Sequence, residues 1–247
     1  MSDGSSNTPA SAGIPVVTGK LVKYQFDFGF LDGRWPALVH GMVLTMELTG
    51  IAVVTGVVFG TLCAVARTGR REWLRRLVAG YVETIRNTPL LVQTFWLFFG
   101  LASIVRLSAF QAAVVALTIN ITAYSSEIIR AGIESIHKGQ VEAAESLGLT
   151  RLQILRDVVL PPAIEKVFPA LTSQFVLMML ASSIMAQISV EELTAAGGRI
   201  QLETFRGLEI YTIIAGIYVA LSLLLRLAFR GMAWAAFPRA RRIKAQG

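Results

Sequence analysis

The sequence predicts an all-α integral membrane protein with five transmembrane helices. Of its 247 residues, 54% are hydrophobic and only 16% are charged, and the mean hydropathy is +0.59. Soluble domains carry about 25% charged residues, so this deficit indicates a lipid environment. Five apolar segments are each long enough to cross about 30 Å of hydrocarbon as a helix. They are Leu48–Ala66, Thr88–Val105, Ala109–Ile129, Val167–Val190 and Leu208–Phe229.

These segments form one transmembrane domain, residues 23–232, between two polar tails. The N-terminal tail, residues 1–22, has neither the basic nor the apolar region of a signal peptide, and its composition is typical of disorder. The C-terminal tail, residues 233–247, is basic.

The distribution of Lys and Arg predicts an external N-terminus and a cytoplasmic C-terminus. With the N-terminus outside, 17 of the 23 Lys and Arg residues fall on the inner side, as the positive-inside rule requires. The same orientation explains the net charge of +7 without a nucleic-acid partner. It also places residues 133–165, between the third and fourth predicted spans, in the cytoplasm.

The residue types argue against an enzyme or a metalloprotein. The single Cys63 lies in an apolar run, and the two histidines, His40 and His137, lie at the edges of predicted spans. No cluster has the spacing of a metal site, and no nucleophile has a plausible base beside it. We therefore expect no catalytic residue and no metal on this chain.

The cytoplasmic segment has the pattern of two short helices. The first, Lys138–Leu147, precedes Gly148, a residue suited to the left-handed turn after a helix. Thr150 and Gln153 have the spacing of a capping box, which begins the second helix. We expect Leu152, Leu155 and Val159 to form one apolar stripe, and Pro161 and Pro162 to end the helix.

The two short helices and the turn between them make a finger. On pattern alone, two interpretations of this finger are evenly matched. It could dock on a partner protein, or it could be an amphipathic hairpin that lies on the bilayer or packs on its own bundle.

The finger resembles the cytoplasmic loop signature of permease subunits of ATP-binding cassette importers. The signature residues are Glu142, Ala143, Ala144, Gly148, Val158, Leu160 and Pro161. Two further stretches, Tyr81–Leu101 and Asn120–Gln140, are similar to motifs of the polar amino acid subfamily. The similarity extends from about Phe26 to Phe229, nearly the whole chain.

The resemblance implies an assembly in the bacterial inner membrane. Two permease subunits form the pathway, two ATP-binding subunits dock on the loops, and a periplasmic amino acid-binding protein delivers substrate. ATP and Mg²⁺ would be bound by the partner, and this sequence has no phosphate-loop motif of its own. The residues expected at the docking contact are Glu142, Ala143, Ala144, Gly148, Leu149, Leu152 and Pro161.

Polar residues inside predicted spans are candidates for the substrate pathway, because such residues tend to face the bundle interior. Asn120, Tyr124 and Glu127 share one face of the third segment. For Glu127 we favour an ion pair with Arg130 or Arg86. Asn120 and Tyr124 could equally bond neighbouring helices. Gln93 is a weaker candidate in the second segment.

The fourth segment places Met178, Ser182 and Ser183 on or beside one face. Here the sequence departs from its relatives, because Leu180 and Ala181 stand where many members have Lys and Asp. The departure favours a heterodimer with a second permease subunit, or a different substrate. It does not choose between them.

The polar segment before the fifth span carries charged residues, where topology would place the binding protein. Among them are Glu191, Glu192, Arg199, Arg206 and Glu209. Such charges are more often simply solvated.

The competing function is an ion-coupled carrier or channel whose finger is only a membrane-surface element. A carrier of that kind would need acidic residues or broken helices at mid-membrane. The mid-span groups identified in this sequence are neutral.

Overall fold

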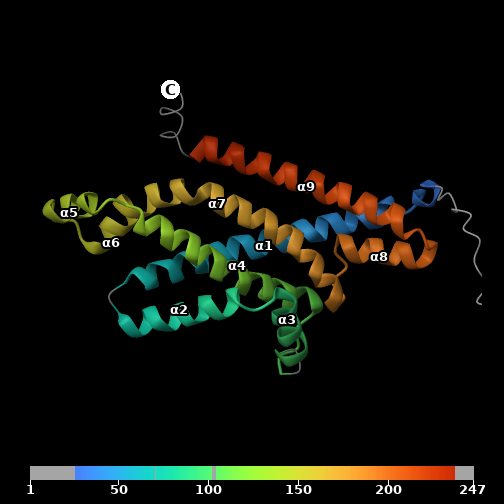
Figure 1. The fold of residues 1–247 in the computed structure, drawn as a ribbon, viewed down its shortest axis with the longest axis horizontal. Coiled ribbons are helices and arrows are strands. Elements are labelled where there is room, and N and C mark those ends of the chain that lie inside the picture. The colour runs from blue at the N-terminus through green and yellow to red at the C-terminus, as the bar shows by residue number, and fades with distance from the viewer. Residues whose placement is uncertain (1–25, 70, 102–103, 237–247) are drawn as a thin grey trace, which may run out of the picture.

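The computed structural model describes residues 26–69, 71–101 and 104–236, and these ranges contain helices and no strand. The α-helices are α1 (Trp35–Thr68), α2 (Glu72–Arg86), α3 (Leu90–Phe95), α4 (Ala109–Glu134), α5 (Lys138–Ser146), α6 (Arg151–Gln153), α7 (Leu160–Ala181), α8 (Leu193–Thr204) and α9 (Gly207–Ala236). Short 3-10 helices cover Gly29–Leu31 and Ser182–Ile188, and π-helical turns cover Trp96–Leu101 and Ile154–Val159. The expected tail 1–22 lies outside the described residues. Residues 233–236 of the expected C-terminal tail continue α9 (Figure 1).

Four helices in the described part of the chain are long and apolar enough to cross a membrane. They are Trp35–Thr68, Ala109–Glu134, Arg151–Ile188 and Gly207–Ala236. Four of the five predicted segments coincide with these helices, which extend beyond most of the predicted boundaries, although the third of them ends at Ile188 and not at Val190.

The segment predicted at Thr88–Val105 is different. Its apolar helix covers only Leu90–Leu101, which is about 18 Å long at 1.5 Å per residue. The preceding helix α2 was not predicted. Only Asn87, Thr88 and Pro89 separate the two helices, and Pro89 has extended backbone angles. The chain therefore turns a corner at Pro89, and α3 leaves the line of α2 (Figure 1).

Helices α1 and α4 run parallel in close contact. The buried face of α1 is a stripe of mostly small residues that includes Ala52, Gly56, Gly60 and Ala64. A Cβ atom on Gly56 would lie 1.8 Å from Ile121 Cγ2, and one on Gly60 would lie 2.7 Å from Ser125 Cβ. Small residues allow helix backbones to approach in this way, and the close approach supplies the van der Waals contact that holds membrane helices together.

Helix α8 packs against the first part of α1 and against α9, at the opposite end of the molecule from α5 and α6 (Figure 1). Gly41 of α1 touches the backbone of Leu193, where a Cβ would lie 2.9 Å from the Leu193 Cα. A Cβ on Gly197 of α8 would lie 1.9 Å from Cδ1 of the Ile214 side chain of α9. A second hydrophobic core, around Leu38, Leu193 and Ile210, results from this packing.

Candidate functional site

The finger predicted to be cytoplasmic consists of α5, a turn at Gly148, and α6, and it lies beyond the ends of α4 and α7 (Figure 1). Gly148 has φ +74°, so its backbone is in the left-handed region that favours glycine. The predicted capping box is present: the Thr150 amide donates to Gln153 Oε1 at 2.8 Å, and the Gln153 amide donates to Thr150 Oγ1 at 3.5 Å. The turn between the two helices is thereby fixed.

The finger has a small hydrophobic core of its own. Ala144, Ile154 and Val159 are buried in it, and side chains such as Val141 and Leu149 pack around them. This core joins α5 to the chain entering α7 and to Ile133 at the end of α4, so the finger is anchored to the bundle at its base.

The prediction that Pro161 and Pro162 end the second helix was wrong, because both lie in the first turn of α7. The preceding π-helical turn accommodates the two prolines in a continuous helical path, since the Leu160 amide donates to the carbonyl of Leu155, five residues earlier. A proline removes one helical donor and crowds the carbonyl four residues before it. The wider turn relieves that crowding, and the helical path continues into α7.

The predicted apolar stripe was also wrong in part. Val159 is buried and Leu155 half-buried, but Leu152 is 73% exposed. The extra residue in the π turn shifts the helical phase and turns Ile154 inward instead. Leu147, at the end of α5, is 81% exposed. The tip of the finger therefore presents two large apolar side chains to its surroundings.

The other residues expected at the docking contact divide between surface and core. Glu142, Ala143 and Gly148 are exposed, Leu149 is half-buried and Ala144 is buried. An open groove of about 700 Å³ runs behind them. Its lining includes Ala143, Leu147, Leu149, Asp157, Pro161 and Glu165.

Two of the predicted pathway residues, Asn120 and Gln93, bond to each other. The Asn120 side-chain amide donates to Gln93 Oε1 at 3.0 Å. Gln93 Nε2 in turn donates to the carbonyl oxygens of Ile85, at 2.7 Å, and Thr88, at 3.0 Å. The pair therefore joins α4 to the corner between α2 and α3.

The hydroxyl groups of Ser182 and Ser183 bond to their own helix. Ser182 Oγ donates to the Met179 carbonyl at 2.6 Å, and Ser183 Oγ donates to the Leu180 carbonyl at 2.7 Å. Met178 is buried in the core that α1, α4 and α7 share. These residues lie at the end of α7, where the helix tightens to a 3-10 turn.

Glu127 is the centre of an ionic cluster that joins three helices. It pairs with Arg130 on its own helix, as expected, and Arg86 Nη1 lies 3.9 Å from Glu127 Oε2. Arg67, at the end of α1, also pairs with it, which sequence spacing had not indicated. Arg130 contacts Glu134 at 2.6 Å. One carboxylate therefore faces three guanidinium groups.

Tyr124, the remaining predicted pathway residue, lies under Arg86. The Arg86 Cζ atom is 5.5 Å from the centre of the Tyr124 ring, within range of a cation–π contact.

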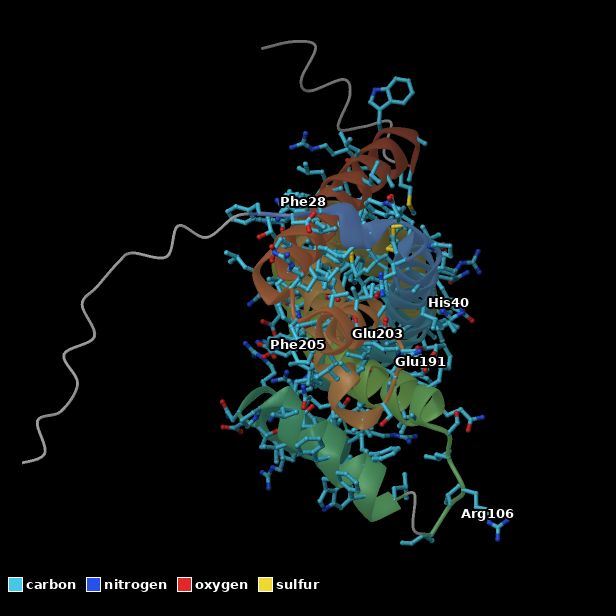
Figure 2. The ribbon with its side chains drawn as sticks, turned by 90° about the vertical axis from the view of Figure 1, so that its right-hand side faces the viewer. Phe28, His40, Arg106, Glu191, Glu203 and Phe205 are labelled. Carbon is cyan, nitrogen blue, oxygen red and sulfur yellow. The ribbon has the colours of Figure 1, made fainter. Side chains whose placement is uncertain are left out.

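The polar segment before α9, predicted to be external, is less solvated than its charges suggested. Glu191 pairs with Arg199 at the surface, and Figure 2 shows Glu191 at the end of the molecule that carries α8. Glu192 and Glu209 are fully buried. Glu192 accepts hydrogen bonds from the Ala195 amide at 2.9 Å and from the Tyr218 hydroxyl at 2.7 Å. Its burial raises the pKa of the Glu192 carboxyl. This carboxyl ties α8 to α9.

Comparison with known proteins decides the family. Residues 56–233, well over half of the chain, match the family of binding-protein-dependent transport system inner membrane components. The chain belongs to this family. It is therefore a permease subunit of an inner-membrane ATP-binding cassette transporter, and the ATPase of such a transporter is a separate subunit.

Individual relatives agree with the assignment. The permease is 36% identical over 210 residues to the glutamine transport system permease protein GlnP of Escherichia coli (strain K12), covering 83% of this chain and 95% of that protein. It is 32% identical over 226 residues to the octopine transport system permease protein OccM of Rhizobium radiobacter, covering 87% and 92%.

Solved structures support the fold. A chain from the crystal structure of an amino acid ABC transporter with histidines superposes with a TM-score of 0.78 at 37% identity, covering 86% of the permease and all of that chain. A chain of the MetNI methionine transporter, at 24% identity, shares the fold with a TM-score of 0.72.

Proposed function

We propose that this permease is one membrane-spanning subunit of an ATP-driven amino acid uptake system. The observation that carries the proposal is the fixed finger with Leu147 and Leu152 exposed at its tip. ATP-binding subunits dock on this finger, and their closure on ATP moves it and opens the pathway outward. The substrate class follows the relatives, whose names specify glutamine and octopine.

The proposed topology has five crossings, an external N-terminus and a cytoplasmic C-terminus. The second crossing would be the broken unit of α2 and α3, since α3 with its π turn is too short alone. The break at Pro89 is covered by the Gln93 side chain, which satisfies two carbonyls of the corner. The finger lies at the same end of the bundle as the Arg67 end of α1, consistent with a basic cytoplasmic face (Figure 1).

The remaining parts of the proposed assembly follow the family. A second permease subunit completes the pathway, with a heterodimer favoured by Leu180 and Ala181. A periplasmic binding protein approaches the end that carries α8. ATP and Mg²⁺ bind to the ATP-binding partners and not to this chain.

Introducing aspartate at the tip of the finger is expected to abolish capture of the ATP-binding subunit. In the Leu147→Asp/Leu152→Asp variant, both apolar contacts are lost and two charges would have to be desolvated at the interface. The measurement is co-purification of the tagged permease with its native neighbours in a mild detergent, expected to fall at least about 30-fold.

The matched control is Lys138→Gln, an exposed change at the base of the same finger. Capture should persist in this control. If the double aspartate variant is inserted and folded and still captures the ATP-binding subunit as the wild type does, the finger is a membrane-surface element.

A further inference from the structure

The groove behind the finger is bordered by the end of α9. Its lining brings together α5, the turn that follows it, the start of α7 and Ala236, the last residue of α9 that the structure describes. Gln140, Ala143, Ala144 and Leu147 of this lining have the i, i+3, i+4, i+7 spacing of one helix face. The finger therefore turns one face of α5 toward the groove, and the sequence after Ala236 continues from its edge.

The charged residues in the described lining of this groove are acidic. They are Asp157 and Glu165, and that lining contains no Lys or Arg. Asp157 pairs with its neighbour Arg156 at 3.2 Å, but the two side chains are 52% and 81% exposed, so the pair contributes little. Glu165 is half-buried, and among the described residues its side chain has no ion-pair or hydrogen-bond partner. Because a partly desolvated carboxylate is costly without a partner, the groove is suited to cationic groups.

Most of the remaining lining is apolar. It includes Leu147, Leu149, Val158 and Ile164. A segment that combines basic and apolar side chains would therefore match both the charge and the surface of the groove.

The sequence that follows Ala236 has this composition. Four of the eleven residues 237–247 are basic and none is acidic. The basic residues are Arg239, Arg241, Arg242 and Lys244. An extended chain would carry Lys244 up to about 26 Å from Ala236 at 3.3 Å per residue, whereas α5, with nine residues, is about 14 Å long. The basic side chains can therefore reach across the groove.

We propose that the basic segment 237–247 of this chain docks in the groove behind the finger. Its guanidinium groups pair with Asp157 and Glu165, and Ile243 packs on the apolar lining. Pro238 disfavours a helical backbone at the residue before it, so an extended path into an open groove suits this segment. Anionic lipid could also satisfy the basic side chains, but it would leave Glu165 without a partner.

The docked segment covers part of the surface predicted to bind the ATP-binding subunit. Four residues expected at that contact, Ala143, Ala144, Leu149 and Pro161, line the same groove. The ATP-binding subunit must therefore displace the segment when it docks, a consequence that rests on the proposed function.

The first test is photo-crosslinking of the purified permease in nanodiscs that contain an anionic phospholipid. The probe is attached to Ile243→Cys in a Cys63→Ala background, and its adducts are mapped by peptide sequencing. We expect adducts with residues 140–165. Adducts with lipid alone, or with other parts of the protein, would overturn the proposal.

Charge reversal tests the recognition itself. The Asp157→Lys/Glu165→Lys variant should lower the yield of these adducts at least about 10-fold, because two attractive contacts become repulsive. Adding Arg241→Glu/Arg242→Glu to this variant should restore the yield, which a misfolded groove would not allow. An unchanged yield in the first variant, or no recovery in the second, would overturn the proposal.

The matched control reverses two charges on the opposite face of α5. Glu142 and Glu145 are exposed and do not line the groove. The Glu142→Lys/Glu145→Lys variant should therefore keep the wild-type adduct yield. A loss equal to that of the groove variant would show that only net charge matters, and would contradict docking in the groove.

A further measurement separates this proposal from the proposed function. Purified ATP-binding subunit is added to the crosslinking reaction, and its capture by the permease is measured in parallel. At saturation, the captured subunit should lower the adduct yield at least about 10-fold. Capture with an unchanged yield would overturn the shared surface while the proposed function stands. Absence of capture would overturn the proposed function, whereas the adducts of the permease alone would still establish the docked segment.

Discussion

Replacing Gly60 by leucine is expected to destabilise the permease by about 3 kcal/mol, because the new side chain has no room at the α1–α4 contact. A Cβ atom there would already lie 3.1 Å from the Ser126 backbone nitrogen and 3.1 Å from the Thr122 carbonyl oxygen. These are backbone atoms, so the contact cannot be relieved by a rotamer change. Thermal unfolding in detergent, followed by size exclusion, measures the loss.

The control for this prediction is Gly50→Leu on the same helix. Gly50 has nothing within 4 Å of an added Cβ, so leucine there adds bulk without a clash inside the subunit. Equal melting temperatures for the two variants would show that the close approach of α1 and α4 does not contribute to stability.

The Glu127→Gln variant should lose about 2 to 4 kcal/mol of stability, since it leaves three guanidinium groups without their shared carboxylate. The side chains of Glu127 and Arg67 are only 25% and 17% exposed, so solvent compensates poorly. Glu134→Gln also removes a carboxylate from Arg130, but Glu134 is 54% exposed and its loss should cost less than about 1 kcal/mol.

Thermal unfolding of both variants checks this prediction, together with the double variant Glu127→Gln/Arg67→Gln. Removing one guanidinium should restore part of the stability. If the Glu127→Gln variant has the same melting temperature as the Glu134→Gln control, the ionic cluster is only a surface network.

Features set by local chemistry could be predicted from the sequence. The Gly148 turn and the Thr150 capping box depend on side chains a few residues apart, and both are present. The four long apolar helices follow from hydropathy alone.

Features that depend on the wider context could not be predicted. The π turn before Pro161 changes the helical phase, so the expected stripe at Leu152 points outward. Helix α2 was missed because charged residues on both sides of its buried Val78 and Val82, such as Arg76 and Glu83, lower its hydropathy. The approach of Arg67 and Arg86 to Glu127 follows only from the packing of α1 and α2 against α4.

The central claim is that ATP-binding partners act on this permease through its finger. The most direct test is site-specific photo-crosslinking in native membranes, using a cysteine-attached probe on Leu152→Cys in the Cys63→Ala background. Leu202→Cys, 70% exposed on α8 at the far end, is the control. The account predicts an adduct between position 152 and the ATP-binding subunit, with a yield that changes when ATP is added, and none from position 202. Adducts from position 152 with lipid alone would contradict the account.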